Sequence, residues 1–511
     1  MENLVCISPT LVQIPSSLAQ TKELRSFLTY IDKKVDYEIK RLKDSLQWSP
    51  EANHPWILDQ ITALKAQRSQ TLVFEQNGVF TTYSGLAPKL AQEFGLEIVV
   101  DYALPESELL PYANKPQHEA RYYQLAAHDA LLAAAGQGPC RISISTGLGK
   151  STLLRMLIKT LGLKTLVQAP STSIATQLYD DFVHHFGKKY VGFYGGGKKE
   201  FKKLITVGID DSLTKIEEGS DAWEDFSKIS LYAADESHLL PSQSLSKVAL
   251  GVARNAPYRL FFSATQLRND GLDLVLDGLT GPTVYTMTTK EGVDQGYLAQ
   301  PIFKIIETQS ASKIRHKDPN KQTRTHQYYN QNVNDLAVQT AQHFVRQMAP
   351  VLILVEEIEQ FTYLLKSAAK HQIPVDDWAF AHAPLTKENR KSLDPRYHAA
   401  DNKALVADFN KGAIQVLVGT SAIATGTDIT SAEVLIYLMG KSSEIKVRQA
   451  IGRGTRGGAK SFVFNPWTGK QKDSVIVIDF DVENIDTTHR HALARQEYYY
   501  DSYPDLEIIR K

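Results

Sequence analysis

The sequence of 511 residues has few cysteines, no net charge and no long hydrophobic run. Cys6 and Cys140 are its only cysteines and lie far apart, which excludes a disulfide framework and a thiolate zinc site and favours a reducing compartment. No apolar stretch approaches the roughly 20 residues needed to cross a bilayer. The start, MENLVCISPTLVQIPSS, lacks the basic segment and the sustained apolar stretch of an export signal. These absences predict a soluble protein of the cytoplasm.

A net charge of zero neither indicates nor excludes a nucleic-acid partner, because clustered charge decides such binding. Clusters occur at Lys188-Lys189, at Lys198-Lys199 with Lys202-Lys203, and over 313–324. A charge run is more often a solvated surface than a binding site, so the clusters give weak support. The chain is long enough for about three domains, and 43% apolar with 22% charged residues is typical of a globular protein.

Two series of short β-type runs alternate with helical stretches and predict an α/β fold with two parallel-sheet lobes. The runs of the first lobe are 141–145, 165–169, 204–209, 229–234 and 258–263. Those of the second are 351–355, 378–381, 414–418, 434–438 and 475–480. We expect the lobes at 111–298 and 299–511. Residues 311–330 are polar and basic without an apolar period, which predicts a loop or insertion.

The first 110 residues predict a small α+β domain ahead of the lobes. Asn77-Gly78 between two β-type runs, 71–75 and 79–83, is a strong hairpin signal. Ser84 suits the N-cap of a short helix over 86–94, which Gly95 would end before another strand over 96–100.

Residues 145–151 read Ser-Thr-Gly-Leu-Gly-Lys-Ser, between an apolar run and a helical run. Glycines there let backbone N–H groups wrap a phosphate at a helix N-terminus. Lys150 would reach the β- and γ-phosphates of ATP, and the Ser151 hydroxyl would bind Mg²⁺. The full P-loop pattern, G-x-x-x-x-G-K-[ST], has glycine where Ile144 stands. The alternative is therefore a chance match in an exposed turn. The strand before the motif and the helix after it disfavour that alternative. The predicted nucleotide-binding loop comprises Thr146, Gly147, Leu148, Gly149, Lys150, Ser151 and Thr152.

A second motif, Asp235-Glu236-Ser237-His238, follows another apolar run and is expected at the carboxyl edge of a strand beside the same phosphates. Asp235 is the expected Mg²⁺ ligand, and Glu236 would orient or deprotonate the attacking water. Ser263 and Thr265 end the next strand, where we expect them and His238 to relay the state of the nucleotide. A lone histidine is more often a packing residue. The neighbouring motif residues make a relay role for His238 as good a hypothesis as a packing role.

Phosphoryl transfer also needs positive charge on the transition state, and residues 449–456, QAIGRGTR, supply it. Arg453 and Arg456 are three apart, which predicts one helical face and a role as arginine fingers, with Gln449 beside them. A basic surface helix is the alternative. Residues 420–430, TSAIATGTDIT, place hydroxyls, Gly426 and Asp428 after a buried strand, which fits a loop that contacts ribose and nucleic-acid backbone.

The motifs RYYQ, STGLGKS, VQAPSTSIATQ, DESH, SAT, TGTD and QAIGRGTR follow one another in the order of the superfamily 2 helicase motifs. The resemblance covers the two lobes, about 400 residues, and implies that both are RecA-like. By that resemblance Arg121 and Gln124 correspond to the adenine-reading Q-motif.

The stretch 172–182, the three glycines from Gly195 and Val207-Gly208 look like those of the UvsW-like bacteriophage helicases, which remodel branched DNA in recombination and fork rescue. The resemblance implies a monomer in the host cytoplasm that contacts DNA mainly through phosphates, with the N-terminal domain recognising branched or duplex substrate. The candidate nucleic-acid contacts are Ser171, Thr172, Gly195, Gly196, Gly197 and Thr420. The aromatic run 498–500 is also similar, although such a run is more often packing.

Three other functions fit the motifs. The motor subunit of a restriction system has nearly the same set but needs a nuclease, and no convincing carboxylate–carboxylate–lysine site is visible in the sequence. An RNA helicase uses the same motor chemistry. An ATP-gated binding or strand-annealing protein would bind nucleotide without processive movement.

Overall fold

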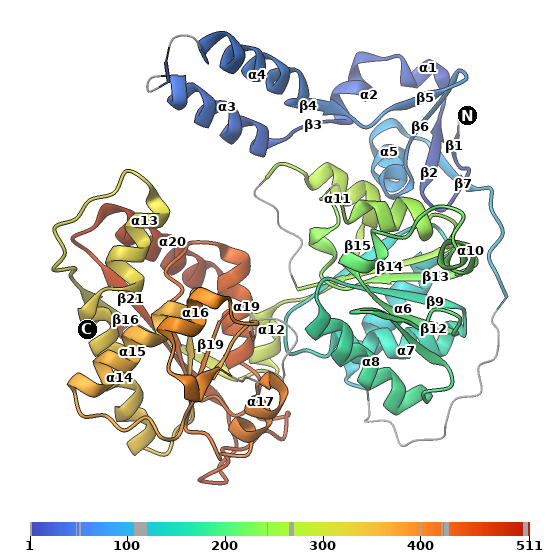
Figure 1. Ribbon diagram of the computed structural model, residues 1–511. Helices are drawn as coiled ribbons and strands as arrows, with labels where there is room; N and C mark the ends of the chain where they lie inside the picture. The colour runs from blue at the N-terminus through green and yellow to red at the C-terminus, as the bar shows by residue number, and fades with distance from the viewer. Residues whose placement is uncertain are drawn as a thin grey trace. The chain divides into compact units, whose positions relative to one another are not determined.

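The computed structural model describes residues 3–46, 49–50, 53–106, 120–242, 244–264, 270–398, 401–420, 423, 429–503 and 509–510. The chain forms two compact units, one of Met1–Ile144 with Gly149–Thr286 and one of Ser145–Leu148 with Met287–Lys511. Each is built on a sheet whose central strands are parallel (Figure 1). Within the described ranges, no helix is both long and apolar enough to cross a membrane.

The N-terminal part of the first unit has its own five-stranded sheet, in the order β5-β6-β2-β1-β7. Its strands are β1 (Asn3–Cys6), β2 (Leu11–Ile14), β5 (Phe74–Gln76), β6 (Val79–Tyr83) and β7 (Glu97–Val100). Asn77 and Gly78, at φ 52° and 77°, turn β5 into β6, as hairpins with two central residues require. The expected hairpin is therefore confirmed.

The helix after the hairpin is α5 (Ala87–Phe94), and Gly95 at φ 64° ends it as expected. Ser84 is not its N-cap, so that expectation was wrong. Ser84 begins the short 3₁₀ helix η2 (Ser84–Leu86), and its hydroxyl donates 2.8 Å to the Pro9 carbonyl. The hydroxyl is bonded to a distant loop rather than to the helix it precedes.

A helical pair that the sequence analysis missed extends from this domain. The added elements are α1 (Ser16–Ala19), α2 (Lys22–Phe27), β3 (Thr29–Ile31), α3 (Lys33–Leu46), α4 (His54–Gln67) and β4 (Ser69–Thr71). Figure 1 shows α3 and α4 side by side beyond β3 and β4. Val35, Ile39, Ile57 and Ile61 form their small separate core. The signal for α3 was present in the sequence, because Val35, Ile39, Leu42 and Leu46 recur at helical spacing.

The larger sheet of the first unit has the order β11-β10-β12-β9-β13-β14-β8-β15. The strands are β8 (Cys140–Ile144), β9 (Thr165–Ala169), β10 (Val191–Gly195), β11 (Lys198–Lys199), β12 (Ile205–Ile209), β13 (Leu231–Ala234), β14 (Tyr258–Ser263) and β15 (Thr283–Met287). The main helices and turns are α6 (Tyr122–Ala135), α7 (Lys150–Leu161), α8 (Thr172–Phe186), α9 (Asp210–Leu213), α10 (Asp221–Phe226), η3 (Ser237–Leu239), η4 (Val248–Val252) and α11 (Asp273–Thr280). Because β8, β9, β13 and β14 are central and parallel, the loops at their carboxyl ends meet at one edge.

The sheet of the second unit is parallel, in the order β18-β19-β17-β20-β21-β16-β22. Its strands are β16 (Gln300–Thr308), β17 (Val351–Leu354), β18 (Trp378–Ala381), β19 (Val416–Gly419), β20 (Val434–Tyr437), β21 (Ser474–Val482) and β22 (Ile509–Arg510). The helices are α12 (Thr289–Asp294), α13 (Pro319–Thr323), η5 (Arg324–Tyr328), α14 (Gln331–Arg346), α15 (Ile358–Lys370), α16 (Lys387–Ser392), η6 (Pro395–Tyr397), α17 (Asn402–Asn410), α19 (Glu444–Gly454) and α20 (Asp486–Ser502). In α20, buried Tyr499 stacks on Phe303 with centroids 4.2 Å apart, so this part of the aromatic run is packing.

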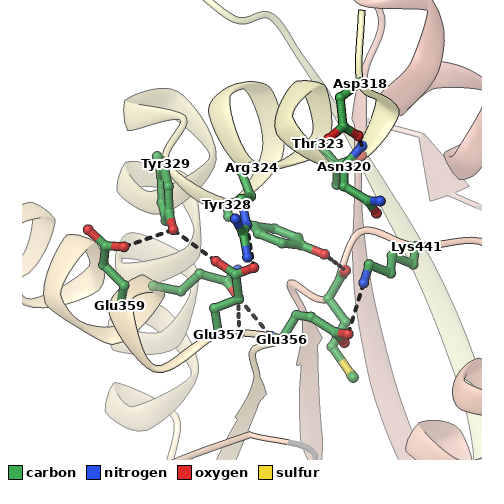
Figure 2. A network of polar contacts seen from close by, with 12 residues as sticks. Asp318, Asn320, Thr323, Arg324, Tyr328, Tyr329, Glu356, Glu357, Glu359 and Lys441 are labelled. Atoms are coloured by element: carbon green, nitrogen blue, oxygen red, sulfur yellow. Dashed lines mark hydrogen bonds and ion pairs between the residues drawn. The ribbon is translucent and has the colours of Figure 1, made fainter. Parts of the chain in front are cut away.

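The segment 311–330 is only partly a loop, which corrects the sequence analysis. It folds into α13 and η5 and contacts Glu357 and Met439, in the loops that follow β17 and β20 (Figure 2). Glu357, after β17, accepts hydrogen bonds from Arg324 Nε at 2.6 Å and from the Tyr329 hydroxyl at 2.8 Å. The Tyr328 hydroxyl donates 2.9 Å to the Met439 carbonyl. The segment therefore holds the connection that leads from β20 into α19.

The sequence pattern does not predict this packing, because the side chains that the segment buries are largely polar. His326 is buried, with one ring nitrogen 2.8 Å from the Ser310 hydroxyl and the other 2.8 Å from the Ile314 carbonyl. Hydrogen bonding of this kind satisfies buried polar groups without leaving an apolar period in the sequence.

Candidate nucleotide site and the residues that support it

The predicted phosphate loop joins the end of β8 to the start of α7. Gly147 and Gly149 have φ of 88° and 80°, a region that favours glycine, and Gly149 is the N-cap of α7. Lys150 Nζ donates 3.2 Å to the Ile144 carbonyl and so lies over the loop. Free N–H groups of a helix N-terminus and a nearby ammonium form an arrangement suited to an anion.

The departure from the full P-loop pattern at Ile144 is explained by the strand. Ile144 is the last residue of β8 and is buried at 1% exposure, outside the left-handed region where glycine would be needed. An apolar side chain therefore fits at this position without changing the turn that follows.

Gln124, predicted to read adenine, lies against the loop. Its amide oxygen accepts from the Arg121 backbone N–H at 3.0 Å, and its amide nitrogen donates 3.3 Å to the Gly149 carbonyl. A Cβ at Gly149 would come within 2.4 Å of that nitrogen, so this glycine is needed for space as well as for its φ. Arg121 donates 2.9 Å to the Tyr123 hydroxyl. The contact of adenine with Arg121 and Gln124 stays a prediction.

The acidic pair follows β13 directly. Burial raises the pKa of Asp235, the neighbouring Glu236 carboxylate adds to the shift, and the Lys150 ammonium opposes it. The parallel strands β8 and β13 are separated only by β14, so the phosphate loop and the acidic pair lie at the same edge of the sheet, where Lys150 acts on the charge of Asp235. Asp235 accepts the Glu236 backbone N–H at 2.9 Å, and Glu236 has a φ of 50°, unusual for a residue other than glycine.

The residues at this edge fit Mg²⁺ bound together with a nucleotide. The Ser151 hydroxyl in the first turn of α7 and the Asp235 carboxylate are oxygen donors, which Mg²⁺ prefers. Among the described residues, no group of three or more histidines, cysteines or acids could hold a metal by itself. Mg²⁺ is commonly held by one or two protein oxygens with substrate phosphates completing the shell, which this pair would allow.

The predicted coupling residues lie together where the structure describes them. His238 is buried, with Nδ1 2.9 Å from the Ser263 hydroxyl and 3.4 Å from Glu236 Oε2. His238 thus links the residue predicted to position water to the end of β14. The relay role stays a prediction, and Thr265 lies outside the described residues, as do Gly426 and Asp428.

The two predicted arginine fingers belong to the second unit but do not share one helical face. α19 carries Gln449 and Arg453 and ends at Gly454, so Arg456 lies beyond it and forms a β-bridge with Leu298. The expectation was wrong because the glycine and Thr455 end the helix between the two arginines. Arg453 is 7% exposed. Burial lowers the pKa of Arg456 to about 10, which leaves it protonated at neutral pH.

Lys472, which the sequence analysis missed, supports the same segment. Its ammonium is buried and donates 2.8 Å to the Thr430 carbonyl and 2.7 Å to the Gly454 carbonyl. Thr430 ends the predicted TGTD loop and Gly454 ends α19, so one side chain joins both. A single lysine in a polar stretch gives no signal of this in the sequence. Burial lowers the pKa of Lys472 to about 7, Glu433 opposes the shift, and Arg456 adds to it.

This shift predicts a dependence of stability on pH. Between about pH 7 and the ordinary value of 10.5, the unfolded chain binds a proton that folded Lys472 has released, so the free energy of unfolding rises with pH. Relative to Lys472→Met, the wild type should gain about 1 kcal/mol per pH unit in urea unfolding from pH 7 to 9. Lys470→Met, at an exposed position, is the control and should follow the wild type. Parallel wild-type and Lys472→Met curves would contradict the shift.

The predicted nucleic-acid contacts occur at element ends. Ser171 caps α8, with its hydroxyl accepting the Ile174 N–H at 3.3 Å, and Thr172 begins that helix. Gly195 ends β10, and Gly196-Gly197 form an open turn with no atom within 4 Å of an added Cβ. Thr420 follows β19 in the second unit and is buried. Their contacts with nucleic acid stay predictions.

Two family models match the chain where these motifs lie. The one described as "Type III restriction enzyme, res subunit" matches residues 117–268, and the one described as "Helicase conserved C-terminal domain" matches 342–458. The chain belongs to superfamily 2 of the helicases.

The relatives of this helicase include DNA motors. It is 29% identical over 212 residues to the DNA 3'-5' translocase XPB2 of Sulfurisphaera tokodaii, which is 41% of this chain and 46% of the relative. It is 20% identical over 411 residues to the ATP-dependent DNA helicase uvsW of Enterobacteria phage T4, or 75% of this chain and 77% of the relative. The chain thus spans about half the length of the translocase. The similarity to the phage helicase confirms the UvsW-like resemblance.

Solved structures confirm the fold of the helicase as two RecA-like lobes, and the small N-terminal domain is seen in the structure itself. A fragment of a putative HsdR subunit of a type I restriction enzyme from Vibrio vulnificus matches with TM-score 0.54 and 18% identity, over 78% of this chain and 69% of that one. S. cerevisiae Dbp5 bound to RNA and ADP BeF3 matches with TM-score 0.50 and 16% identity, over 76% and 89% of the two chains.

Proposed function

We propose that this helicase is an ATP-dependent DNA motor that unwinds or branch-migrates branched DNA in recombination, replication or repair. The observation that carries the proposal is the placement of Lys150, on a glycine-shaped loop at a helix N-terminus, at the same edge of the sheet as Asp235 and Glu236. The sequence similarity to the phage DNA helicase, over three quarters of the chain, supports DNA as the substrate.

In the proposed mechanism the loop 146–152 holds the triphosphate of ATP, and Lys150 moves from the Ile144 carbonyl to the phosphates. Ser151 and Asp235 would hold Mg²⁺, which would supply positive charge against the developing negative charge. Glu236 orients the attacking water, and its contact with His238 carries the change toward Ser263.

The second unit completes the proposed mechanism. Arg453 and Arg456 act as fingers on the transferring phosphoryl group, and Gly426 with Asp428 contact the nucleotide. Arg121 and Gln124 hold the base. Because Gln124 also contacts the Gly149 carbonyl, base binding and loop geometry are coupled.

We propose that DNA contacts both lobes through its phosphates, at Ser171, Thr172, Gly195 to Gly197 and Thr420. Contacts of this kind are independent of sequence and sensitive to salt. We assign recognition of branched or duplex substrate to residues 1–110, and the motor to 111–298 and 299–511.

A panel of substrates tests the function. ATPase stimulation and strand separation should be measured with forks, four-way junctions, RNA-displaced loops, plain duplex and RNA. We expect the largest stimulation with branched DNA. Equal or greater stimulation by RNA would contradict a DNA motor, and binding without continued unwinding in the presence of a trap strand would indicate a strand-annealing protein.

A restriction motor subunit is the second candidate, favoured by the family model over 117–268 and by the fold shared with the HsdR fragment. In that case a partner subunit would supply the nuclease. Stimulation by linear duplex equal to that by forks and junctions would favour this function over branched-DNA remodelling.

A further inference from the structure

The outer edge of the larger sheet in the first unit is a short hairpin. β10 and β11 pair antiparallel, with Gly195 opposite Lys198 and Tyr194 opposite Lys199. The chain then returns along β10, since the Glu200 N–H donates 3.0 Å to the Phe193 carbonyl. An added Cβ at Gly192 would lie 1.9 Å from the Glu200 carbonyl oxygen, so this close approach requires a glycine.

This return path brings separate lysine-bearing segments together. Lys203 Nζ donates 3.1 Å to the Lys189 carbonyl, which joins the segment after β11 to the loop after α8. The gathered side chains, called the lysine cluster below, are Lys188, Lys189, Lys198, Lys199, Lys202 and Lys203. All but half-buried Lys203 are exposed.

Aromatic rings support three of these ammonium groups. Lys189 lies over Tyr190 at 5.5 Å, Lys198 over Phe193 at 5.7 Å and Lys202 over Phe201 at 5.8 Å from the ring centroids. Such contacts favour one position of each ammonium, and all three lysines remain exposed.

Little negative charge opposes the cluster. Glu200 lies within the hairpin segment, and Asp221 is 3.9 Å from Lys202, with both of those side chains more than two-thirds exposed. An ion pair that exposed contributes little. Asp180 adds a third carboxylate near Tyr179, whose ring packs on Phe193. Six lysines still form a concentrated basic surface in a chain whose net charge is zero.

Protection of the sheet edge is a simpler role for lysines, since charged edge strands resist pairing with another chain. It accounts for Lys198 and Lys199 on β11. It does not account for Lys188, Lys189 and Lys202, which lie outside the strands.

We propose that the lysine cluster is a binding surface for the phosphodiester backbone of DNA. The proposal rests on the proposed function and extends the DNA path from the adjacent turn at Gly196-Gly197 onto the edge of the sheet. Lysine ammoniums are point charges that bind phosphates without reading bases, so the cluster adds affinity and not sequence preference.

The test is the salt dependence of DNA binding by the full chain. In the variant, Lys188, Lys198, Lys199 and Lys202 are changed to Gln, which spares Lys189 and Lys203, whose contact joins the segments. The matched control changes four exposed lysines of the second unit, Lys387, Lys391, Lys411 and Lys470, to Gln. Dissociation constants for labelled single-stranded and duplex DNA are measured from 50 to 200 mM salt, and thermal unfolding checks the fold of both variants.

If the cluster binds phosphates, the slope of log affinity against log salt should fall in magnitude by up to about 3.6 on duplex or about 2.8 on single strands. A fall on one substrate only identifies which form of DNA lies on the cluster. A folded variant with the wild-type slope on both, or a control that loses as much, would overturn the proposal. Failure of the wild type to bind DNA would instead refute the proposed function.

Discussion

Replacing Lys150 by alanine should lower the ATPase turnover in the presence of DNA by at least about a hundredfold, the usual loss on removing one preorganised group from a developing charge. Lys150 lies over the phosphate loop and opposes the raised pKa of Asp235. Its removal therefore leaves the phosphates without their ammonium and disfavours the ionised Asp235 that a metal needs. Steady-state turnover at saturating ATP and DNA measures the loss.

Lys159→Ala is the matched control for this experiment, because Lys159 is an exposed lysine on the same helix, α7. It should keep wild-type turnover. Wild-type turnover in the Lys150→Ala protein would end the assignment of this loop as the ATP site.

Loss of either arginine finger is expected to have the largest effect on chemistry. Arg453→Ala and Arg456→Ala should each lower turnover by about 10³ to 10⁵, the range seen where fingers have been tested. Binding of a fluorescent ATP analogue should change far less, because a finger acts mainly on the transition state. Single-turnover hydrolysis and analogue binding, measured on each variant, separate the two effects.

Arg448→Ala is the control on the same helix, since Arg448 pairs with Glu444 at 2.7 Å and is not a predicted finger. The two fingers are tested separately because Arg453 lies in α19 and Arg456 beyond its end. Full turnover in one variant would show that this arginine is buried for structural reasons only.

The sequence predicted best those features that depend on neighbouring residues. The strand 165–169 and the strand 258–263 have the bounds of β9 and β14, because continuous apolar runs in a parallel sheet are buried on both faces. The turn at Asn77-Gly78 follows from the φ values that these residues tolerate. The meeting of Lys150 with Asp235 follows from the rule that motifs after central parallel strands share one edge.

The features that were missed depend on distant partners. Ser84 has the right chemistry for an N-cap, but the Pro9 carbonyl competes for its hydroxyl. The segment 311–330 packs through polar side chains such as His326, which leave no apolar period. Lys472 contacts carbonyl groups at Thr430 and Gly454, and no pattern around a single lysine reveals acceptors so far along the chain.

The left-handed backbone at Glu236 has a thermodynamic consequence. A side chain held in that region costs of order 1–3 kcal/mol, which glycine would largely avoid. Glycine has no carboxylate, however, so the most relaxed residue for this turn is one that could not orient water. Stability and chemistry therefore favour different residues at this one position. Selection for stability alone would favour glycine at position 236, and the proposed hydrolytic step would lose the carboxylate that orients water.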